Sequence, residues 1–306
     1  MSMKAVLNFS LSTPSSRYGP ANTYCDVAAF MSLRRLNLAK QLPYTERMKP
    51  LAEFKSKVDF VLTDIDDTLT DEGLLGPEAY LALWKLAGAG IHVIPVTGRP
   101  AGWCEMIARQ WPVAGVIGEN GGFYFRYKDR KMERHFVHDF EKQIENRRKL
   151  ELIQKEVLDS VPGSAIASDQ FCRFMDLAID FCEDVPKLPK SEVDRIVKIF
   201  KKYGAQAKVS SIHVNGWFGK YDKLSMSLKF LKDEFGLSEQ QVQERCCFSG
   251  DSPNDEPMFT YFPLSFAVAN ISEFLDDIEH KPGFLAKQRG GLGFAEITEQ
   301  ILKYRS

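Results

Sequence analysis

Three carboxylates crowd into one short stretch of the sequence. Asp64, Asp66 and Asp67 follow directly after a largely apolar run at residues 58–62. Carboxylates this close together repel one another, and at least one pKa rises unless a positive charge lies among them. Carboxylate oxygens are ligands that Mg2+ accepts, and a carboxylate can also attack a phosphorus atom. The stretch therefore indicates a phosphoryl-transfer site. A solvated acidic turn is the alternative, but it would not explain why the acids follow an apolar strand so directly.

Polar groups at three further element ends could complete such a site. Thr97 follows a second apolar strand, Asp251 and Asp255 follow a later one, and Lys223 lies at the start of a helix. Ligands of open α/β sheets bind beyond the carboxyl ends of the strands, so these groups are expected to converge. Lys223 would then neutralise phosphate oxygens, and Thr97 would donate a hydrogen bond to them. Thr97 could also cap the helix that follows it, and helix N-termini themselves bind anions.

The elements that must position these groups alternate along the chain. Strands are expected at residues 57–66, 91–96 and 114–117, and a helix that begins at Pro77 separates the first two. Glycine-rich turns lie between the strands and the helices. This alternation is typical of a parallel, doubly wound sheet. The predicted fold class is therefore α/β, with a Rossmann-like core.

The pattern changes after the third strand. Alternating apolar residues on both sides of a charged turn predict a hairpin, and residues 207–214 predict a single strand. Two helices are expected between them, and Ser191 and Asp194 would form the capping box of the second. Residues 123–218 are therefore predicted to be an inserted α+β unit, with two helices on an antiparallel sheet.

The chain is thus expected to have three parts. Residues 57–122 and 219–306 form the predicted core, and residues 123–218 form the inserted unit. Residues 1–56 form an N-terminal extension, rich at first in Ser, Pro, Gly and Asn, with one helix expected at residues 27–42. The extension carries no residues to which a chemical role can be assigned.

Composition narrows the classes of function. The 306 residues carry a formal net charge of −1, which does not favour a nucleic-acid partner or an anionic membrane surface. No apolar run approaches the length of a membrane span. The six cysteines lack CxxC spacing, so buried free thiols in a reducing compartment are expected, and the cytoplasm is the predicted location.

The ordered motifs resemble those of the haloacid dehalogenase-like (HAD) superfamily. The DxDxT motif is present as Asp64-Ile65-Asp66-Asp67-Thr68, and VTGR and GDSPND follow in order, carrying Thr97 and Asp251 respectively. ENGG after the third strand and AVAN near the end of the chain are also similar to this family. The narrower resemblance is to subfamily IIB, the Cof-type phosphatases with a large C2 cap, which include sucrose-phosphatases, mannosyl-3-phosphoglycerate phosphatases and the related phosphomannomutases. It covers the chain from about residue 57 onward.

The resemblance implies roles for the acidic residues. Asp64 would be the nucleophile and Asp66 the general acid and base. Mg2+ would be the cofactor, held by Asp64, the backbone carbonyl of Asp66 and Asp251. Asp255 would support the metal site.

The resemblance also implies a phosphate-binding set. Thr97 and Lys223 would bind the phosphate, and Asn254 would lie near it. Lys220 is the alternative to Lys223, because the branch often has Lys-Gly before this helix whereas the chain has Asp222-Lys223. The WDK form of the phosphomannomutases favours Lys223.

Substrate contacts are expected from polar side chains of the inserted cap. The candidates are Asp169, Arg173, His213, Asn215 and Trp217. For each of them taken singly, packing within the cap or solvation is the competing interpretation.

Together these features predict a Mg2+-dependent phosphatase that forms an aspartyl-phosphate. The expected partner is a small phosphorylated metabolite, with sugar phosphates as the first class to test, and neither a nucleic acid nor a membrane is expected. A phosphomutase and a non-catalytic binding protein on the same scaffold are the alternatives. The sequence leaves the individual substrate and the oligomeric state open.

Overall fold

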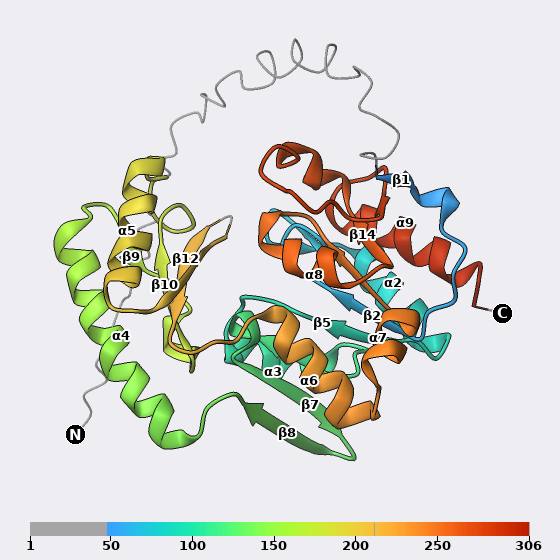
Figure 1. The fold of residues 1–306 in the computed structure, drawn as a ribbon, viewed down its shortest axis with the longest axis horizontal. Helices are drawn as coiled ribbons and strands as arrows, with labels where there is room; N and C mark the ends of the chain where they lie inside the picture. Colours follow the sequence, from blue (N-terminus) through green and yellow to red (C-terminus); the bar gives the residue numbers. More distant parts are fainter. Residues whose placement is uncertain (1–47, 211, 306) are drawn as a thin grey trace, which may run out of the picture. The chain divides into compact units, whose positions relative to one another are not determined.

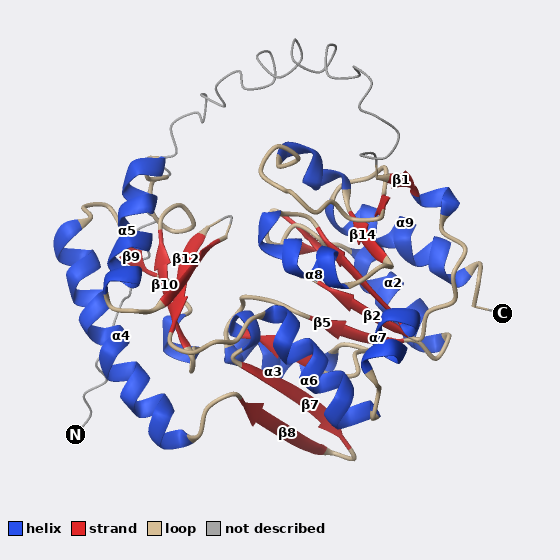
Figure 2. Ribbon diagram, in the orientation of Figure 1, coloured by secondary structure: helices blue, strands red, loops and turns tan. Residues whose placement is uncertain are grey.

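A six-stranded parallel sheet is the central element of the computed structural model, which describes residues 48–210 and 212–305. Every pair of neighbouring strands is parallel, as predicted. Their order across the sheet is β1 (Lys49–Pro50), β15 (Phe284–Leu285), β14 (Ser265–Ala267), β13 (Cys246–Gly250), β2 (Phe60–Thr63) and β5 (His92–Pro95). Figure 2 shows the strands and the helices around them.

Helices cover both faces of this sheet because its central strands are apolar on both sides. In β2, Val61 packs into one hydrophobic cluster, whereas Phe60 and Leu62 pack into the other. The first cluster is completed by α2 (Pro77–Gly88), α3 (Ala101–Gln110) and α9 (Gly290–Leu302). The second is completed by α6 (Lys223–Phe235), α7 (Glu239–Arg245) and α8 (Glu256–Tyr261). The doubly wound α/β class is therefore confirmed.

The parallel pairing places the predicted acids at one edge of the sheet. β2 lies between β13 and β5, with Thr63 in register with both Ser249 and Pro95. Asp64 follows the end of β2, and Asp251 follows the end of β13. Because the strands run in the same direction, both acids lie beyond the same carboxyl edge.

Part of the predicted N-terminal extension belongs to this sheet. β1 pairs in parallel with β15, and Phe54 is completely buried. The Phe54 ring makes edge contacts with Phe266 and Phe284, at centroid distances of 4.9 and 5.4 Å. The remainder of the extension, including the helix predicted at residues 27–42, lies outside the described residues.

The predicted hairpin consists of β7 (Phe123–Lys128) and β8 (Lys131–Phe136). Asp129 and Arg130 at its tip have φ values of 50° and 61°, the left-handed pair that tight hairpins favour. β7 pairs antiparallel with β6 (Val116–Gly118), and β6 continues from the core through a parallel bridge to Val96. The hairpin thus pairs with a core strand, although we had assigned it to the inserted unit.

A separate antiparallel sheet lies between the hairpin and α6 in the sequence, and we refer to residues 140–217 as the cap. Its strands are ordered β11 (Gln206–Val209), β12 (His213–Trp217), β10 (Asp176–Asp180) and β9 (Ala165–Ile166). α4 (Phe140–Ser160) and α5 (Lys190–Lys202) pack against it (Figure 1). Ile153 of α4, Ile196 of α5 and Ile179 of β10 share one buried apolar cluster, so the cap has a core of its own.

The single strand predicted at residues 207–214 is wrong. β11 ends at Val209 and β12 begins at His213, and the two strands pair antiparallel. Ser210 makes the reversal: its hydroxyl accepts a hydrogen bond from the His213 N–H at 3.0 Å, and its own N–H donates to the His213 carbonyl. The polar pair Ser210-Ser211 interrupts the apolar alternation at this point, a signal that the prediction of one continuous strand overlooked.

The capping box predicted at Ser191 and Asp194 is also wrong. α5 begins at Lys190, and its N-cap is Pro189, two residues before the predicted N-cap Ser191; Pro189 makes no side-chain capping bond. The fixed backbone of Pro189 starts the helix instead. A capping box is present at the start of α7, between Ser238 and Gln241.

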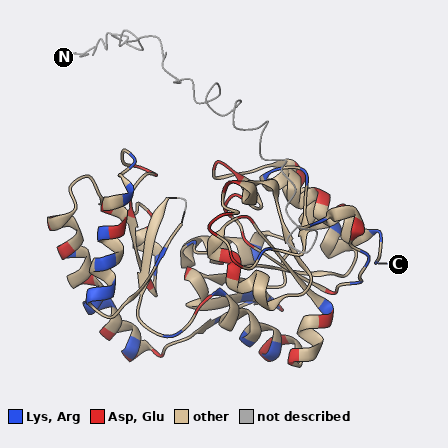
Figure 3. Ribbon diagram, turned by 45° about the horizontal axis from the view of Figure 1, so that its top comes forward, with Lys and Arg blue, Asp and Glu red and all other residues tan. Residues whose placement is uncertain are grey.

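Charged residues are distributed over both the core and the cap (Figure 3). The longest described helix, α4, has 21 residues and carries charged side chains along most of its length. Among the described residues, no helix is both long enough and apolar enough to cross a membrane.

Phe54 provides a test of the β1 segment. Replacement of Phe54 by Ala should lower the free energy of unfolding by about 3–5 kcal/mol, because it removes a fully buried ring. Phe140→Ala is the matched control: that ring is 74% exposed, and its loss should change the free energy by less than about 0.5 kcal/mol. Urea unfolding followed by fluorescence measures both. Equal effects in the two variants would mean that residues 48–56 do not belong to the core.

Candidate active site

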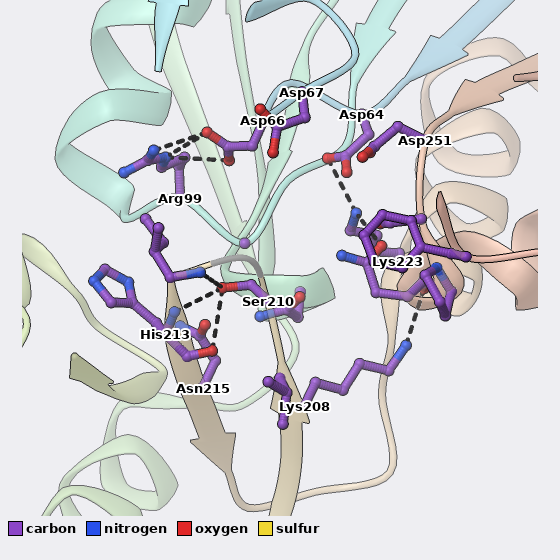
Figure 4. Close-up of a pocket in the computed structure, with 18 of the residues that line it drawn as sticks. Asp64, Asp66, Asp67, Arg99, Lys208, Ser210, His213, Asn215, Lys223 and Asp251 are labelled. Atoms are coloured by element: carbon purple, nitrogen blue, oxygen red, sulfur yellow. Dashed lines mark hydrogen bonds and ion pairs between the residues drawn. The ribbon is translucent and has the colours of Figure 1, made fainter. Parts of the chain in front are cut away.

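A cavity of about 370 Å³ lies beyond the carboxyl edge of the sheet. Asp64, Asp251 and Lys223 line it from the core, and Lys208 and His213 line it from the cap (Figure 4). The volume lies in the range of small-molecule sites, roughly 300–1,000 Å³.

Lys223 holds two of the predicted acids together. Its ammonium nitrogen lies 3.0 Å from Oδ1 of Asp64 and 2.9 Å from Oδ1 of Asp255. All three side chains are buried. The Ile65 N–H donates to the same oxygen of Asp64 at 2.9 Å, so that oxygen has a fixed position. One cation therefore serves two buried carboxylates.

Lys223 is positioned by the start of α6. Asp222 is the N-cap, and it forms a capping box with Ser225 through a 2.7 Å bond from the Ser225 N–H. Gly121 of the ENGG motif packs directly against this turn at a φ of 99°. A Cβ at Gly121 would lie 2.1 Å from the Asp222 carbonyl oxygen, so only glycine permits this approach.

A third acid lies close to this pair. Carboxylate oxygens of Asp64, Asp251 and Asp255 all lie within 4.8 Å of one another. The Thr68 hydroxyl donates to Asp251 at 3.2 Å, and the Asp251 N–H donates to Asp255 at 3.2 Å. The first bond orients the Asp251 carboxylate and the second orients the Asp255 carboxylate.

Burial makes the charged forms of these acids costly. It raises the pKa of Asp64 to about 7, and the charge of Lys223 only partly offsets this effect. Burial, together with the charges of Asp255 and Asp64, also raises the pKa of Asp251 well above its usual range. A hard divalent cation would supply the missing positive charge, and these three residues offer it oxygen ligands.

Asp66 lies apart from this cluster. Its carboxylate accepts hydrogen bonds from the Arg99 guanidinium, at 2.9 Å from Nε and 2.8 Å from Nη2. Figure 4 shows Asp66 and Arg99 on one side of the cavity and Asp64 and Asp251 on the other. The structure thus separates the two acids for which we predicted different catalytic roles, and the metal contact expected from the Asp66 carbonyl stays a prediction.

Arg99 was missed as a site residue, although it ends the VTGR motif that we had singled out. Its Nη1 lies 3.5 Å from a carboxylate oxygen of Glu183, which belongs to the cap. The other Glu183 oxygen lies 2.9 Å from Nε2 of His213. A chain of charged groups therefore links Asp66 in the core to His213 in the cap.

Thr97 is completely buried and does not line the cavity. Its hydroxyl oxygen accepts a hydrogen bond from the Arg99 N–H at 3.0 Å, which stabilises the loop that carries Arg99. The predicted N-cap role is wrong, because α3 begins at Ala101 and its N-cap is Pro100. The phosphate contact proposed for Thr97 stays a prediction, whereas Asn254 does line the cavity.

Three of the five predicted cap residues line the cavity, namely Arg173, His213 and Asn215. Asp169 does not line it and instead pairs with Nε of Arg173 at 2.7 Å. Trp217 is also outside, stacked on Tyr221 at a centroid distance of 5.7 Å. The indole therefore packs against the segment that follows the cap and does not face the cavity.

Arg173 joins the cap to the core. Its Nη1 donates to the Gly98 carbonyl at 3.0 Å and to Asp176 at 3.1 Å. Asn215 donates to the same Asp176 carboxylate at 3.0 Å. The Arg173 guanidinium is almost wholly buried, and these hydrogen bonds satisfy its Nη1 donors.

Glu119 of the ENGG motif makes a second junction. Its carboxylate accepts 3.0 Å hydrogen bonds from the N–H groups of Ala101 in the core and Phe174 in the cap. The Met175 N–H also donates to it. Sequence reasoning assigned no role to Glu119, although the motif that contains it was noticed.

Comparison with known proteins finds the same architecture among solved structures. No protein-family model matches the sequence, and no curated protein matches it. Solved structures do match. A haloacid dehalogenase-like hydrolase from Bacteroides thetaiotaomicron has a TM-score of 0.58 at 15% identity, over 80% of this chain and 100% of that one. A sucrose-phosphatase from Synechocystis, determined with sucrose and phosphate, has a TM-score of 0.56 at 16% identity, over 81% and 98%.

The fold is that of the haloacid dehalogenase-like hydrolases. More narrowly, it matches a sugar phosphatase of HAD subclass IIB, with a TM-score of 0.56 at 12% identity over 81% of this chain and 99% of that one. The predicted resemblance is therefore confirmed at the level of the fold. At such identities the activity must be argued from the residues of the cavity.

Lys223 provides a test of this electrostatic arrangement. Lys223→Met should lower the free energy of unfolding by about 3–5 kcal/mol at pH 8, because it leaves Asp64 and Asp255 buried without their cation. Lys220→Met, at the exposed alternative lysine, should change it by less than about 0.5 kcal/mol. Urea unfolding measures both variants.

The deficit in Lys223→Met should depend on pH. The folded-state pKa of Asp64 already lies above its ordinary value, so the carboxylate costs stability as the pH rises from about 4 to about 7. Loss of the ammonium strengthens this cost, and the deficit should shrink at pH 5, where Asp64 holds its proton. A deficit that is the same at pH 5 and pH 8, or one that Lys220→Met reproduces, would contradict the arrangement.

Proposed function

We propose that the protein is a Mg2+-dependent phosphatase that hydrolyses small phosphorylated metabolites through an aspartyl-phosphate. The observation that carries this proposal is the set of three buried acids, Asp64, Asp251 and Asp255, which share one ammonium group at the carboxyl edge of a HAD-type sheet. Three such carboxylates need more positive charge than Lys223 provides.

Asp64 is the proposed nucleophile. One of its oxygens bonds to phosphorus as the bond from phosphorus to the ester oxygen breaks. The Ile65 N–H and Lys223 fix Oδ1 of Asp64, which leaves the second carboxylate oxygen for the attack. Lys223 would then lie beside the equatorial oxygens of the transferred phosphoryl group and stabilise their charge.

Asp64, Asp251 and Asp255 are the residues that would hold Mg2+. The bound cation supplies charge that offsets both the carboxylates and the incoming phosphate. Asp251 is held for this role by the Thr68 hydroxyl. The backbone carbonyl of Asp66 is a further ligand that the family resemblance implies.

Asp66 is the proposed proton carrier. In the first step it would protonate the leaving oxygen, and in the second it would take a proton from the water that attacks phosphorus and releases Asp64. Arg99 binds its carboxylate through two donors, so proton transfer would require at least one of those bonds to break. Arg99 thus acts as a positioning residue for Asp66.

Sugar phosphates are the proposed substrate class. Two solved structures of this fold belong to proteins described as a sucrose-phosphatase and a sugar phosphatase. Ser210, His213 and Asn215 bring hydroxyl, imidazole and amide groups to the cavity from the cap, and such groups suit a polyol.

Hydrolysis of p-nitrophenyl phosphate tests the proposal. The wild-type protein should release p-nitrophenol with Mg2+ and lose this activity with a chelator. Asp64→Asn should lower kcat by more than about a thousandfold, because it removes the nucleophile. Asp129→Asn makes the same chemical change at the exposed hairpin tip and should leave kcat unchanged.

Two results would refute the proposal. One is full activity in Asp64→Asn. The other is no Mg2+-dependent turnover by the wild-type protein on p-nitrophenyl phosphate or on a panel of phosphorylated sugars. A partial and equal loss in Asp64→Asn and Asp129→Asn would also argue against a specific role for Asp64.

A further inference from the structure

Two cationic side chains of the cap line the cavity without an acidic partner. Within the described chain, the other three cations at the cavity are paired, Lys223 with Asp64, Arg99 with Asp66 and Arg173 with Asp169. Lys190 and Lys208 line the same cavity, and neither makes an ion pair with a carboxylate of the described residues. The cap therefore brings two cationic groups that form no ion pair with any carboxylate in the described part of the chain.

Lys208 is the more deeply placed of the two. It lies in β11, where it is in register with Asn215 of β12, and its side chain is half-buried. Its ammonium group donates to the Asn254 carbonyl oxygen at 3.2 Å, a neutral acceptor in the core (Figure 4). An ammonium group has three donors, so further donors remain for a ligand.

Asn254 relates Lys208 to the proposed phosphate site. Lys223 lies 3.5 Å from the side-chain oxygen of Asn254, while Lys208 contacts the backbone oxygen of the same residue. The two ammonium groups thus flank one residue of the loop between Asp251 and Asp255. Burial lowers the pKa of Lys208, and the nearby charge of Lys223 lowers it further. The proximity of the two ammonium groups therefore has an electrostatic cost.

We propose that Lys208 binds a second anionic group of the substrate, a carboxylate or a second phosphate, carried close to the phosphate ester that is hydrolysed. This inference rests on the proposed phosphatase function and narrows its substrate class to phosphate esters with two anionic groups. Lys190, at the exposed start of α5, is a second cationic group that lines the cavity.

The physical basis is the cost of a partly buried cation. An ammonium group removed from water loses hydration that one carbonyl oxygen only partly replaces. A second anionic group would compensate for the lost hydration through a charge-assisted hydrogen bond, which is stronger than a bond between neutral groups. An ester with a neutral group in that place would leave the cation uncompensated, so the site discriminates against it.

Matched pairs of esters test the proposal. 2-Phosphoglycerate and glycerol 2-phosphate differ only in a carboxylate that replaces a hydroxymethyl group. Glucose 1,6-bisphosphate and glucose 1-phosphate differ in a second phosphate. The measured quantity is the ratio of kcat/KM within each pair, in the wild type, in Lys208→Met and in Lys198→Met. Lys198 is the control, an exposed cap lysine that does not line the cavity.

The wild type should prefer the doubly anionic member of at least one pair. Lys208→Met should lower that preference by about tenfold, as expected for the loss of one charge-assisted bond, and Lys198→Met should keep it within about twofold. The pair that responds tells whether a carboxylate or a phosphate is the second group. An equal loss for both members of each pair would show that Lys208 serves only the shared phosphate, and would overturn the proposal, as would no loss at all.

Calorimetry separates this inference from the proposed function. If the wild type hydrolyses none of the four esters, the same ligands are titrated into the three proteins with Mg2+ present, and the ratios of Kd replace those of kcat/KM. A tenfold loss of preference in Lys208→Met then supports the second anion site although the phosphatase function fails. Turnover with unchanged ratios supports the function and refutes the second site.

Discussion

The shortage of positive charge at the end of β2 is the constraint on which the rest of the structure depends. Lys223 lies within 3.0 Å of both Asp64 and Asp255, and Asp251 completes a cluster whose oxygens lie within 4.8 Å of one another. Buried carboxylates in this number are unstable as ions unless further cations arrive. The proposed metal and phosphate sites would satisfy this condition together, because the metal would neutralise the acids and the ammonium would face the phosphate.

The surrounding fold keeps these groups from relaxing apart. The parallel register of β13 and β2 fixes the strand ends that carry Asp251 and Asp64. Asp222 caps the helix that carries Lys223, and Gly121 lets that turn approach the core closely. The repulsion between the buried carboxylates is therefore opposed by the packing of the elements that carry them.

The cap adds a second level of organisation. Arg173 and Glu119 bind backbone groups across the junction between core and cap, so they join the two parts. Glu183 lies close to both Arg99 and His213, and therefore couples the proposed proton carrier to the cap. Lys208 of the cap also contacts the core, through the Asn254 carbonyl oxygen. In the proposed function, residues of the core carry the chemistry, whereas groups of the cap would distinguish substrates.

The acids could be predicted because an apolar strand followed at once by Asp64 and Asp66 is a local pattern, and the order of the later motifs supported it. Lys223 was expected from its place at the start of a helix and from the family resemblance, whose WDK form favoured it over Lys220. Lys208 was not, because nothing in an alternating strand tells which side chain reaches across a cavity. The β1 segment was missed because its strand has only two residues and its apolar anchors, Met48, Leu51 and Phe54, are too few to give a periodic pattern. The turn at Ser210 was missed although the polar pair Ser210-Ser211 interrupts the apolar alternation there.

Direct trapping of the proposed aspartyl-phosphate tests the central claim. The wild-type protein would be mixed with a phosphorylated substrate and Mg2+, quenched during turnover and reduced with borohydride, which converts an acyl phosphate of aspartate to homoserine. Mass spectrometry of the peptide that spans residues 58–70 should find homoserine at position 64 only when substrate is present. Turnover without modification at position 64, or modification at Asp66 in its place, would contradict the account.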